Sequence, residues 1–401
     1  MKRTILTLTA GMALYGALLL PAFANHETGE VIAPELLVAG DYNEDGNLDL
    51  LVNCAGFAHE AVLIGDGQGG FTLAGHFAAD TLPKGLQVAD IDGDGHLDAV
   101  VANNWGYDET VLLGDGKGSF HILAPPSEVD GDGEPVRMLL RDFNNDGKLD
   151  IAVNAPDDNS ILLFFGDGKG NFPAPDSEIE DVPHPFGMAS ADLNGDGNLD
   201  IVNVSPIRGG NSVMTVYMGD GTGEFTLGYS SPTSAFPTSV KIGDMNNDGK
   251  LDLVVAGAQP LNGGSGNFIQ IFLGDGTGNF TLNQTVDMGR GNLKGDIALG
   301  DFNEDGKLDV AFPKTGNQDG SETRSVIVFI FFGDGAGTVA LGPTLTVGPE
   351  PHTVVTADFN KDGHLDLAVT NRGDGTVTCL LGDGHGNFTT SSTTSVLSPL
   401  D

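Results

Sequence analysis

The chain has 401 residues, of which 56 are acidic and 18 basic, so its formal net charge at pH 7 is −38. A charge of this sign repels a phosphate backbone and argues against nucleic-acid binding. Only two cysteines are present, Cys54 and Cys379, which excludes a disulfide framework as the main source of stability. They lie in the first and the last of the repeats described below. The sequence is compatible with a bridge between them and with two separate buried thiols.

The N-terminus has the three parts of a secretory signal peptide. Lys2 and Arg3 form a basic start, an apolar run follows, and residues 22–24 (Ala-Phe-Ala) place small side chains around a cleavage site. We therefore expect a cleaved signal peptide over residues 1–24, a lead over 25–34, and export of the mature chain to the periplasm or the extracellular medium. No second apolar span follows, so we expect no membrane span in the mature chain. A retained N-terminal anchor is the alternative.

A nine-residue motif, D-x-[DN]-x-D-G-x-L-D, occurs seven times after this leader. Its copies cover residues 41–49, 90–98, 142–150, 192–200, 244–252, 301–309 and 358–366. Successive copies begin 49 to 57 residues apart, a spacing that is typical of a repeat architecture. The motif therefore marks the unit from which the protein is built.

Every copy places oxygen-bearing side chains at positions one, three, five and nine and a glycine at position six. Calcium takes about six to eight oxygen ligands, and the glycine allows the loop to turn tightly around the ion. An EF-hand would need Glu at position twelve and flanking helices, whereas Val52, Val101 and Val153 occupy that position here and the flanks are short β-branched runs. Turns rich in Asn, Asp and Gly without metal are the alternative. So many carboxylates so close together would repel each other, however, unless a cation lay among them.

We therefore predict about seven calcium ions, one in each loop, which would change the net charge from −38 to −24. Position seven varies between Asn, His and Lys, as expected if only its backbone carbonyl binds. The predicted ligands are Asp41, Asn43, Asp45, Asn47 and Asp49; Asp90, Asp92, Asp94, His96 and Asp98; Asp142, Asn144, Asp146, Lys148 and Asp150; Asp192, Asn194, Asp196, Asn198 and Asp200; Asp244, Asn246, Asp248, Lys250 and Asp252; Asp301, Asn303, Asp305, Lys307 and Asp309; and Asp358, Asn360, Asp362, His364 and Asp366.

Each unit contains a second turn, G-D-G-x-G-x-F, in which only the sixth copy lacks Phe. One apolar run lies on each side of either turn, which gives four short strands per unit of about fifty residues, as in a propeller blade. We predict an all-β fold: a seven-bladed β-propeller of four-stranded antiparallel blades over residues 35–396, with a tail at 397–401. The calcium loop is expected in the strand 1–2 hairpin of each blade. An open solenoid is the alternative, but no capping repeats are visible.

The two turns must lie on the same face of such a propeller, because they join strands 1–2 and strands 3–4. The connections between strands 2 and 3 lie on the opposite face. Extra residues in units four to six fall within 205–211, 259–266 and 313–325, all of them in this second type of connection. Because variable loops on a rigid scaffold commonly bind partners, this opposite face is the predicted ligand face.

Trp105 and Tyr107 lie in one of these connections and are the best candidates for stacking on a sugar ring. A hydrophobic plug between blades is the alternative role for this aromatic pair. Chain segments that lead into the innermost strands supply further candidates.

His184 and His352 precede innermost strands near the mouth of the predicted central channel. Two imidazoles at one pore bind a metal or transfer protons, whereas ordinary hydrogen-bonded loop histidines are the alternative. Lys84 and Arg137 occupy equivalent approaches, and Arg372 lies in a strand 2–3 connection.

The loops DIDGDGHLD (90–98) and DLNGDGNLD (192–200) resemble those of FG-GAP/VCBS repeat proteins, whose relatives include the integrin α-subunit propeller. The resemblance covers nearly everything after the leader. It implies a seven-bladed propeller with calcium in the strand 1–2 hairpins, held by the first, third, fifth and ninth residues of each loop and by the carbonyl of the seventh. Unlike the integrin propeller, this sequence has a full loop in every expected blade, and we expect no further domains, so an integrin-like signalling role is not implied.

No nucleophile elbow, HExxH helix, P-loop or dinucleotide-binding loop is present in the sequence. The function that fits best is a secreted, calcium-binding, non-catalytic binding or adhesion module, monomeric, whose partner is a glycan or a protein at a surface. The alternative is an extracellular enzyme that cleaves polysaccharides or phosphoesters at the mouth of the central channel. A convergent cluster of His, Arg, Tyr or carboxylate side chains there, with shifted pKa values, would favour the enzyme. A purely structural protein of the cell envelope is a third interpretation.

Overall fold

The computed structural model describes residues 33–55, 59–79, 83–104, 108–128, 137–173, 175–207, 212–261, 264–290, 293, 295–314 and 325–397. All of them belong to one unit, Val31–Asp401. The predicted signal peptide, nearly all of the lead and the tail, and the residues Trp105 and Tyr107 lie outside the described residues.

Every regular element in this part of the chain is a β-strand. The first four blades consist of β1 (Ala33–Gly40), β2 (Asp49–Ala55), β3 (His59–Gly65) and β4 (Phe71–Ala78); β5 (Pro83–Ala89), β6 (Asp98–Asn103), β7 (Asp108–Gly114) and β8 (Phe120–Glu128); β9 (Met138–Arg141), β10 (Asp150–Ala155), β11 (Ser160–Phe164) and β12 (Ser177–Ile179); and β13 (Gly187–Ala191), β14 (Asp200–Ser205), β15 (Val213–Gly219) and β16 (Phe225–Pro232). The last three consist of β17 (Pro237–Gly243), β18 (Asp252–Leu261), β19 (Gly264–Gly274) and β20 (Phe280–Arg290); β21 (Ala298–Gly300), β22 (Asp309–Lys314), β23 (Ile327–Gly333) and β24 (Val339–Thr346); and β25 (Pro351–Ala357), β26 (Asp366–Asn371), β27 (Thr376–Gly382) and β28 (Phe388–Ser395). Among the described residues, no helix has the length and apolar character needed to cross a membrane.

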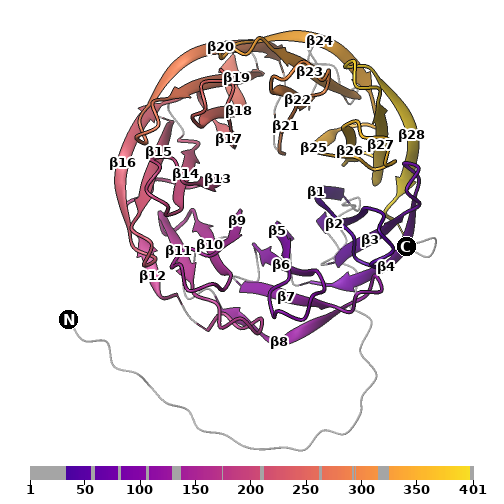
Figure 1. Ribbon diagram of the computed structural model, residues 1–401, viewed down its shortest axis with the longest axis horizontal. Coiled ribbons are helices and arrows are strands. Elements are labelled where there is room, and N and C mark those ends of the chain that lie inside the picture. The colour runs from indigo at the N-terminus through magenta and orange to yellow at the C-terminus, as the bar shows by residue number, and fades with distance from the viewer. Residues whose placement is uncertain are drawn as a thin grey trace, which may run out of the picture. The chain divides into compact units, whose positions relative to one another are not determined.

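Each blade is a sheet of four consecutive antiparallel strands, in the order in which they occur in the chain. In the first blade, β1 pairs with β2 from Ala33↔Ala55 to Gly40↔Asp49. The seven sheets surround one axis, and the first strand of each blade lies nearest to it (Figure 1). The predicted all-β, seven-bladed propeller is thus confirmed.

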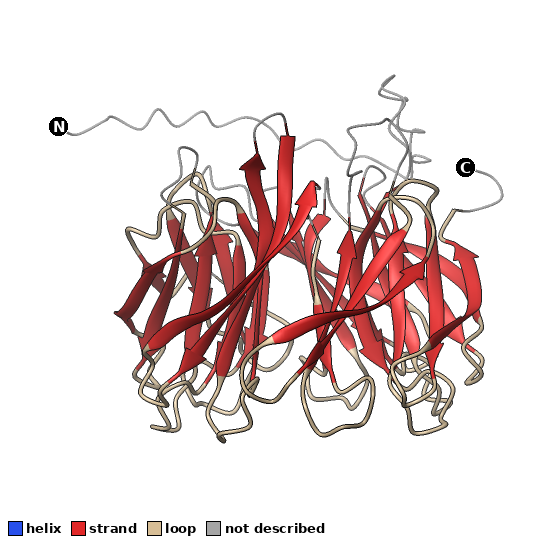
Figure 2. Ribbon diagram, turned by 90° about the horizontal axis from the view of Figure 1, so that it is seen from above, coloured by secondary structure: helices blue, strands red, loops and turns tan. Residues whose placement is uncertain are grey.

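The nine-residue motif lies between the first and second strands of every blade, as predicted. The second turn joins the third and fourth strands, so both turns lie on the same face, where Figure 2 shows loops gathered along one side of the blades. The extra residues of the fifth blade do not form a simple loop as the sequence suggested. They lengthen the hairpin, because β18 and β19 remain paired as far as Leu261↔Gly264.

The second strand of each blade is buried on both faces, because a neighbouring blade covers each of them. All six residues of β10, for example, are buried. The apolar residues form seven clusters, one in each interface between adjacent blades; the cluster between blades three and four joins Ile161 and Leu163 to Ile201 and Tyr217. A strand with two buried faces needs no alternation of polar and apolar residues, which explains the continuous apolar runs after each acidic motif.

Side chains of blade seven close the ring onto blade one, without any strand shared between the two blades. The hydroxyl of Ser392 donates a hydrogen bond to the carbonyl of Gly69 at 2.7 Å, and Thr394 donates to Phe71 at 3.1 Å. His76 contacts the carbonyl of Val396 at 2.8 Å. Closure therefore depends on side-chain hydrogen bonds and on the apolar cluster between these two blades.

The two cysteines lie in that closing cluster. Cys54 comes from blade one and Cys379 from blade seven, and both are buried free thiols. Burial raises the pKa of both thiols, to about 12 for Cys379, so neither is a reactive thiolate at neutral pH. Of the two alternatives left open by the sequence, the structure has the separate thiols.

A buried carboxyl without a hydrogen-bond partner lies between blades one and two. Glu60 and Asn53 are partners on adjacent strands. Each lies two residues along its strand from a residue that faces blade two, Val62 and Leu51 respectively, and therefore lies on the same face. Both are fully buried, and neither the carboxyl oxygens of Glu60 nor the amide atoms of Asn53 have a hydrogen-bond partner. Burial alone raises the pKa of Glu60 well above its ordinary value, because the charged form loses its hydration there.

We expect Glu60→Gln to stabilise the propeller at pH 7–8 and to have little effect near pH 5. The pKa of Glu60 is higher in the folded protein than in the unfolded chain. The stability that the protonated carboxyl contributes is therefore fully present below the unfolded-state pKa and is lost as the pH rises through the folded-state pKa. The neutral amide does not ionise and avoids this loss. Thermal unfolding in saturating calcium, compared between pH 5 and pH 8, measures the effect. Glu224→Gln, at an exposed glutamate, is the matched control, and an equal response of the two variants would contradict the prediction.

Candidate functional site

The seven motifs fold into one type of loop, called here acidic loops one to seven in chain order. In loop three, one oxygen of Asp142 accepts the N–H of Asp146 at 3.1 Å and the other accepts the N–H of Gly147 at 2.8 Å. Asn144 also accepts the N–H of Asp146, at 2.9 Å, and Asp146 accepts that of Lys148 at 2.9 Å. Gly147 has φ +83°, a conformation that glycine adopts without strain. The backbone thus holds the oxygens of positions one, three and five within the loop.

The aspartate at position nine ties each loop to the second turn of its own blade. Asp150 is fully buried; its Oδ2 accepts the N–H of Phe143 at 2.9 Å and its Oδ1 accepts that of Gly166 at 3.0 Å. The same pair of hydrogen bonds is made by Asp49, Asp98, Asp200, Asp252, Asp309 and Asp366. We call this arrangement the position-nine clamp.

Burial raises the pKa of every clamp carboxyl, and nearby loop carboxylates add to the rise, while the two backbone N–H groups oppose it. For Asp49 and Asp309 the pKa is raised to about 6. The loops therefore concentrate negative charge.

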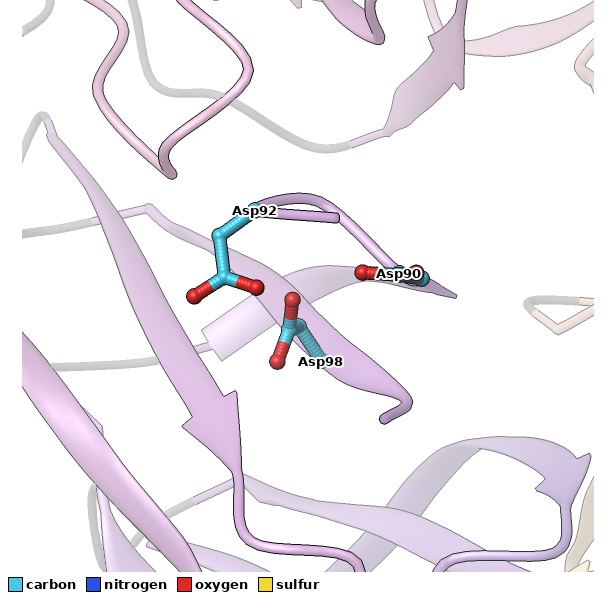
Figure 3. Close-up of side chains that lie close together, drawn as sticks. All are labelled: Asp90, Asp92 and Asp98. Atoms are coloured by element: carbon cyan, nitrogen blue, oxygen red, sulfur yellow. The ribbon is translucent and has the colours of Figure 1, made fainter. Parts of the chain in front are cut away.

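Loop two brings three carboxylates together. One oxygen from each of Asp90, Asp92 and Asp98 lies within 4.8 Å of the other two (Figure 3). In the other six loops Asn replaces Asp92, and its amide oxygen accepts the same backbone hydrogen bond from position five. A set of oxygen donors with excess negative charge, partly buried, fits a hard divalent cation such as calcium.

Three loops carry a lysine at position seven, and its ammonium pairs with the aspartate at position five. The pairs are Lys148–Asp146 at 3.2 Å, Lys250–Asp248 at 3.9 Å and Lys307–Asp305 at 3.2 Å. These lysines reduce the negative charge that their loops offer to a cation. Loop two has four carboxylates at its predicted ligand positions, where every other loop has three, and no lysine, so it offers the most negative charge to a cation.

Adjacent loops also contact each other, because position four of one loop reaches position six or seven of the next. These contacts, called inter-loop latches, are Glu44–His96, Asn145 Nδ2 to Asn198 Oδ1 at 3.0 Å, Asn247 Nδ2 to Gly306 O at 3.1 Å, Glu304–His364 at 2.5 Å and Lys361 Nζ to Asn47 Oδ1 at 2.6 Å. The last latch joins loop seven to loop one. Where position four is glycine, at Gly93 and Gly195, the side chain needed for a latch is missing. The latches thus connect loops five, six, seven, one and two in one series and loops three and four in another.

We expect Glu304→Ala to loosen loop seven and Lys361→Ala to loosen loop one. Each substitution removes one latch and leaves the ligand positions of all loops unchanged, so the effect should appear only in the next loop along the ring. Amide hydrogen exchange of residues 358–366 and 41–49 measures it, and each variant is the control for the other. Equal exchange in both loops of both variants would show that the latches have no mechanical role.

A group of charged side chains lies along the innermost strands, most of them toward the strand ends opposite the acidic loops. Glu35 in β1 is 5 % exposed, and its carboxylate lies 2.6 Å from Nζ of Lys84 and 3.4 Å from the guanidinium of Arg372. Burial raises the pKa of Glu35, but the surrounding positive charges, Lys84 first, outweigh burial and hold it below its ordinary value. His352 Nδ1 donates to the carbonyl of Glu35 at 3.0 Å, and burial lowers the pKa of His352 to about 4.

Asp296, just before β21, is the second acidic centre of this group. Its Oδ2 lies 2.5 Å from Nζ of Lys241, and its Oδ1 accepts the hydroxyl of Ser239. Burial raises the pKa of Asp296, but Lys241 and Arg137 outweigh it and hold the pKa below its ordinary value. Arg137 donates from Nη1 to the carbonyl of Lys84 at 3.1 Å and interacts electrostatically with both Asp296 and Glu35.

These seven residues form the channel-mouth cluster: Glu35, Lys84, Arg137, Lys241, Asp296, His352 and Arg372. They come from six blades, and blade four adds the ring of Phe186, 5.7 Å from the guanidinium of Arg137. Innermost strands of all blades surround the axis here (Figure 1). At neutral pH both carboxyls are ionised and the imidazole is neutral. The arrangement is therefore suited to holding charge rather than to transferring protons.

The histidines singled out in the sequence occupy different environments. His352 is buried within the channel-mouth cluster. His184 is exposed, with φ +44°, and its N–H donates to Asn159 at 3.1 Å. Among the described residues no hydrogen bond or ion pair joins the two imidazoles, so the structure does not assemble the histidine pair. The position of the aromatic pair Trp105 and Tyr107 lies outside the described residues.

Of the residues in this cluster, Lys84, Arg137, His352 and Arg372 were predicted candidates from the sequence, whereas Glu35, Lys241 and Asp296 were not. The sequence could have indicated Glu35 and Lys241, because each of them, like Lys84, is a charged residue within the largely apolar segment that leads into an acidic loop. Nothing local distinguished Asp296. Its role depends on Lys241, which is 55 residues away in the chain.

Comparison with solved structures supports the fold at low sequence identity. A protein of unknown function from Desulfotomaculum acetoxidans DSM 771 is 13% identical, with 80% of this chain and 91% of that chain covered and a TM-score of 0.53. A protein from Bacteroides uniformis ATCC 8492, provisionally described as a 6-phosphogluconolactonase, is 13% identical, with coverages of 88% and 94% and a TM-score of 0.57. A protein from Lactobacillus plantarum is 13% identical, with coverages of 90% and 96% and a TM-score of 0.58. Such identities establish similarity of fold alone.

A search of curated proteins found no match to this chain. Comparison with protein families matches the FG-GAP-like repeat over residues 41–101, 90–153, 142–203 and 204–255, and the FG-GAP repeat over 351–385. These segments contain acidic loops one to five and seven and cover more than half of the sequence. The chain therefore belongs to the FG-GAP-like repeat family.

Proposed function

We propose that this protein is an exported, calcium-stabilised propeller that acts as a non-catalytic binding module for a glycan or a protein at a surface. The observation that carries this proposal is the sevenfold repetition of one acidic loop, with the same hydrogen bonds and the same buried aspartate in every blade. A device repeated identically in all blades serves the scaffold, because a catalytic site needs different groups that converge at one place.

Calcium would be held by the side chains of positions one, three, five and nine of each loop and by the carbonyl of position seven. When bound, it would neutralise carboxylates that otherwise repel each other across a few ångströms. The position-nine clamp joins this charge to the rest of the blade, since the same carboxylate fixes the second turn. Ion binding is thereby linked to the stability of the fold.

The channel-mouth cluster argues for binding over catalysis. The enzyme alternative needs a carboxyl or imidazole poised to exchange protons near neutral pH. Glu35 and Asp296 have lowered pKa values and ion-pair partners, and His352 is buried and neutral.

Metal content and thermal stability test the calcium part of the proposal. We expect about seven calcium ions per chain by mass spectrometry, one fewer in Asp146→Asn, and no change in Asp157→Asn, an exposed aspartate outside the loops. An unchanged stoichiometry in Asp146→Asn would refute the ligand assignment. Expression of the full chain with N-terminal sequencing tests export, with Asn25 expected as the first residue of the mature protein.

A glycan array and an assay of reducing-end release separate binding from catalysis. The calcium-loaded protein is expected to retain a defined set of glycans without cleaving them. Release of new reducing ends that depends on the protein would favour the polysaccharide-cleaving alternative. Light scattering in the same buffer tests the expected monomer.

A further inference from the structure

We propose that the channel-mouth cluster binds an anionic group, a carboxylate or a sulfate, at the end of a small ligand. The ligand would enter from the face opposite the acidic loops. This inference rests on the proposed role of the propeller as a binding module, and it names the place and the ligand chemistry.

The ion pairs of the channel-mouth cluster contain more positive than negative side chains. Three cations, Lys84, Lys241 and Arg372, form ion pairs with only two carboxylates, Glu35 and Asp296. Among these five described side chains, with Arg137 left aside, one positive charge exceeds the negative ones. This surplus stands out in a chain of net charge −38, whose other lysines lie largely in the acidic loops and second turns. A partly buried surplus charge is stabilised by a bound counter-ion.

The positive side chains of the cluster are more exposed than the carboxylate of Glu35. The side chains of Lys84, Lys241 and Arg372 are 27, 35 and 37% exposed, whereas that of Glu35 is 6% exposed. An approaching ligand therefore contacts ammonium and guanidinium groups first, while one of the two carboxylates is shielded beneath them.

The three cations of the cluster are held in place by ion-pair partners before any ligand binds. Each cation is already held by a partner: Lys84 and Arg372 by Glu35, and Lys241 by Asp296, which Ser239 also binds. Fixed side chains lose little conformational entropy when a ligand binds. The ammonium of Lys84 and the guanidinium of Arg372, which share Glu35, offer several N–H donors to the lone pairs of a carboxylate or a sulfate.

The negative electrostatic field of the whole protein further restricts the class of ligand that can reach this site. A long polyanion would be repelled by the acidic surface, while a single terminal charge reaches the channel mouth without bringing other charges near that surface. An acidic sugar at the end of a glycan has this character, and so does a sulfated sugar. The shared chemistry is one localised anionic group on an otherwise neutral body.

Binding of sodium glucuronate and sodium sulfate to the calcium-loaded protein tests this site, with glucose as the neutral counterpart. Titration calorimetry at constant ionic strength measures the affinity for each. We expect glucuronate to bind, glucose not to bind, and Arg372→Gln to weaken glucuronate binding by at least about fivefold. The matched control is Arg141→Gln, which removes an exposed charge from the acidic-loop end of β9, where Arg141 donates to the carbonyl of Leu140. It should change binding by less than about twofold.

Binding of both anions would support a site for a simple anionic group, and binding of glucuronate alone would support an acidic sugar. Absence of binding by both anions would overturn the inference, and so would equal weakening in Arg372→Gln and Arg141→Gln. If Arg372→Gln does not fold, Lys241→Gln replaces it in the same comparison. A glycan found on the array that binds Arg372→Gln unchanged would overturn the channel-mouth site while leaving the binding-module function intact.

Discussion

Removal of calcium by excess chelator is expected to lower the melting temperature of the protein by at least about 10 °C. Each acidic loop would then hold three or four carboxylates without a counter-ion, and one of them, at position nine, is fully buried in every blade. Their mutual repulsion favours opening of the loop. Because each clamp also fixes the second turn of its blade, opening exposes the edge of the blade core.

Scanning calorimetry with calcium, with chelator, and after calcium is restored measures this effect. Magnesium in place of calcium is the informative control, since it prefers a smaller octahedral set of ligands and retains its waters. We expect calcium to restore the melting temperature fully and magnesium to restore it in part or not at all. If the calcium-loaded protein and the chelated protein melted at the same temperature, the acidic loops would be bare turns and their proposed role would be wrong.

The second large effect is expected for Asp150→Asn, which should destabilise the protein by about 2–4 kcal/mol even without calcium. Asp150 accepts two backbone N–H groups, one in its own loop and one sixteen residues away, and it is fully buried. An amide presents one oxygen and one NH₂ group, so one of the buried donors would face another donor. The loss belongs to the fold itself and therefore persists when calcium is removed.

Asp146→Asn is the matched variant, because Asp146 lies in the same loop at a position whose side chain is 37% exposed. It should lower stability only when calcium is present, whereas Asp150→Asn should lower it in both conditions. Denaturant unfolding of both variants with calcium and with chelator distinguishes the two roles. Loss of the Asp150→Asn effect in chelator would show that position nine acts only as a metal ligand and has no separate clamp function.

The clamp shows how one residue type serves two purposes in this fold. From the sequence, the aspartate at position nine was interpreted only as a calcium ligand. In the structure its two oxygens each accept a backbone N–H, one from position two and one from the glycine that precedes the second turn. A carboxylate oxygen has more than one acceptor site, so these hydrogen bonds and a metal ion are compatible. The number of residues between the acidic loop and the second turn varies among blades. The clamp is present in all of them because the position-nine aspartate begins strand two and the glycine that it contacts lies at or just after the end of the adjacent strand three.

The inter-loop latches show a second property that the motif alone conceals. From the sequence, position seven was assigned only its backbone carbonyl, and position four was assigned no role. In the ring the side chains at these two positions are paired: Glu44 contacts His96, and Glu304 contacts His364. Pairing of this kind becomes visible only when the loops are placed next to one another.

Much of the architecture was determined by the sequence alone. Seven copies of one motif, each followed at a similar distance by a second turn, define seven units of four strands, and a unit that cannot bury its own faces must stack against its neighbours. The location of the acidic loops in the strand 1–2 hairpins, and the shared face of the two turns, follow from strand count. These features are local and repeated, so each copy supports the interpretation of the others.

The channel-mouth cluster was decided only by the tertiary structure. Glu35 and Lys84 each lie six residues before an acidic loop, but the residue at this position differs from blade to blade. The ion pairs among Glu35, Lys84, Lys241, Asp296 and Arg372 span separations in the chain from 49 residues to 337. A charged residue in a short apolar run has no meaning by itself; whether it is paired, buried or reachable depends on which blades the closed ring brings next to it. The scaffold could be predicted from the sequence because its motifs are repeated in every unit. The channel-mouth cluster could not, because its residues differ from blade to blade and come together only when the ring closes.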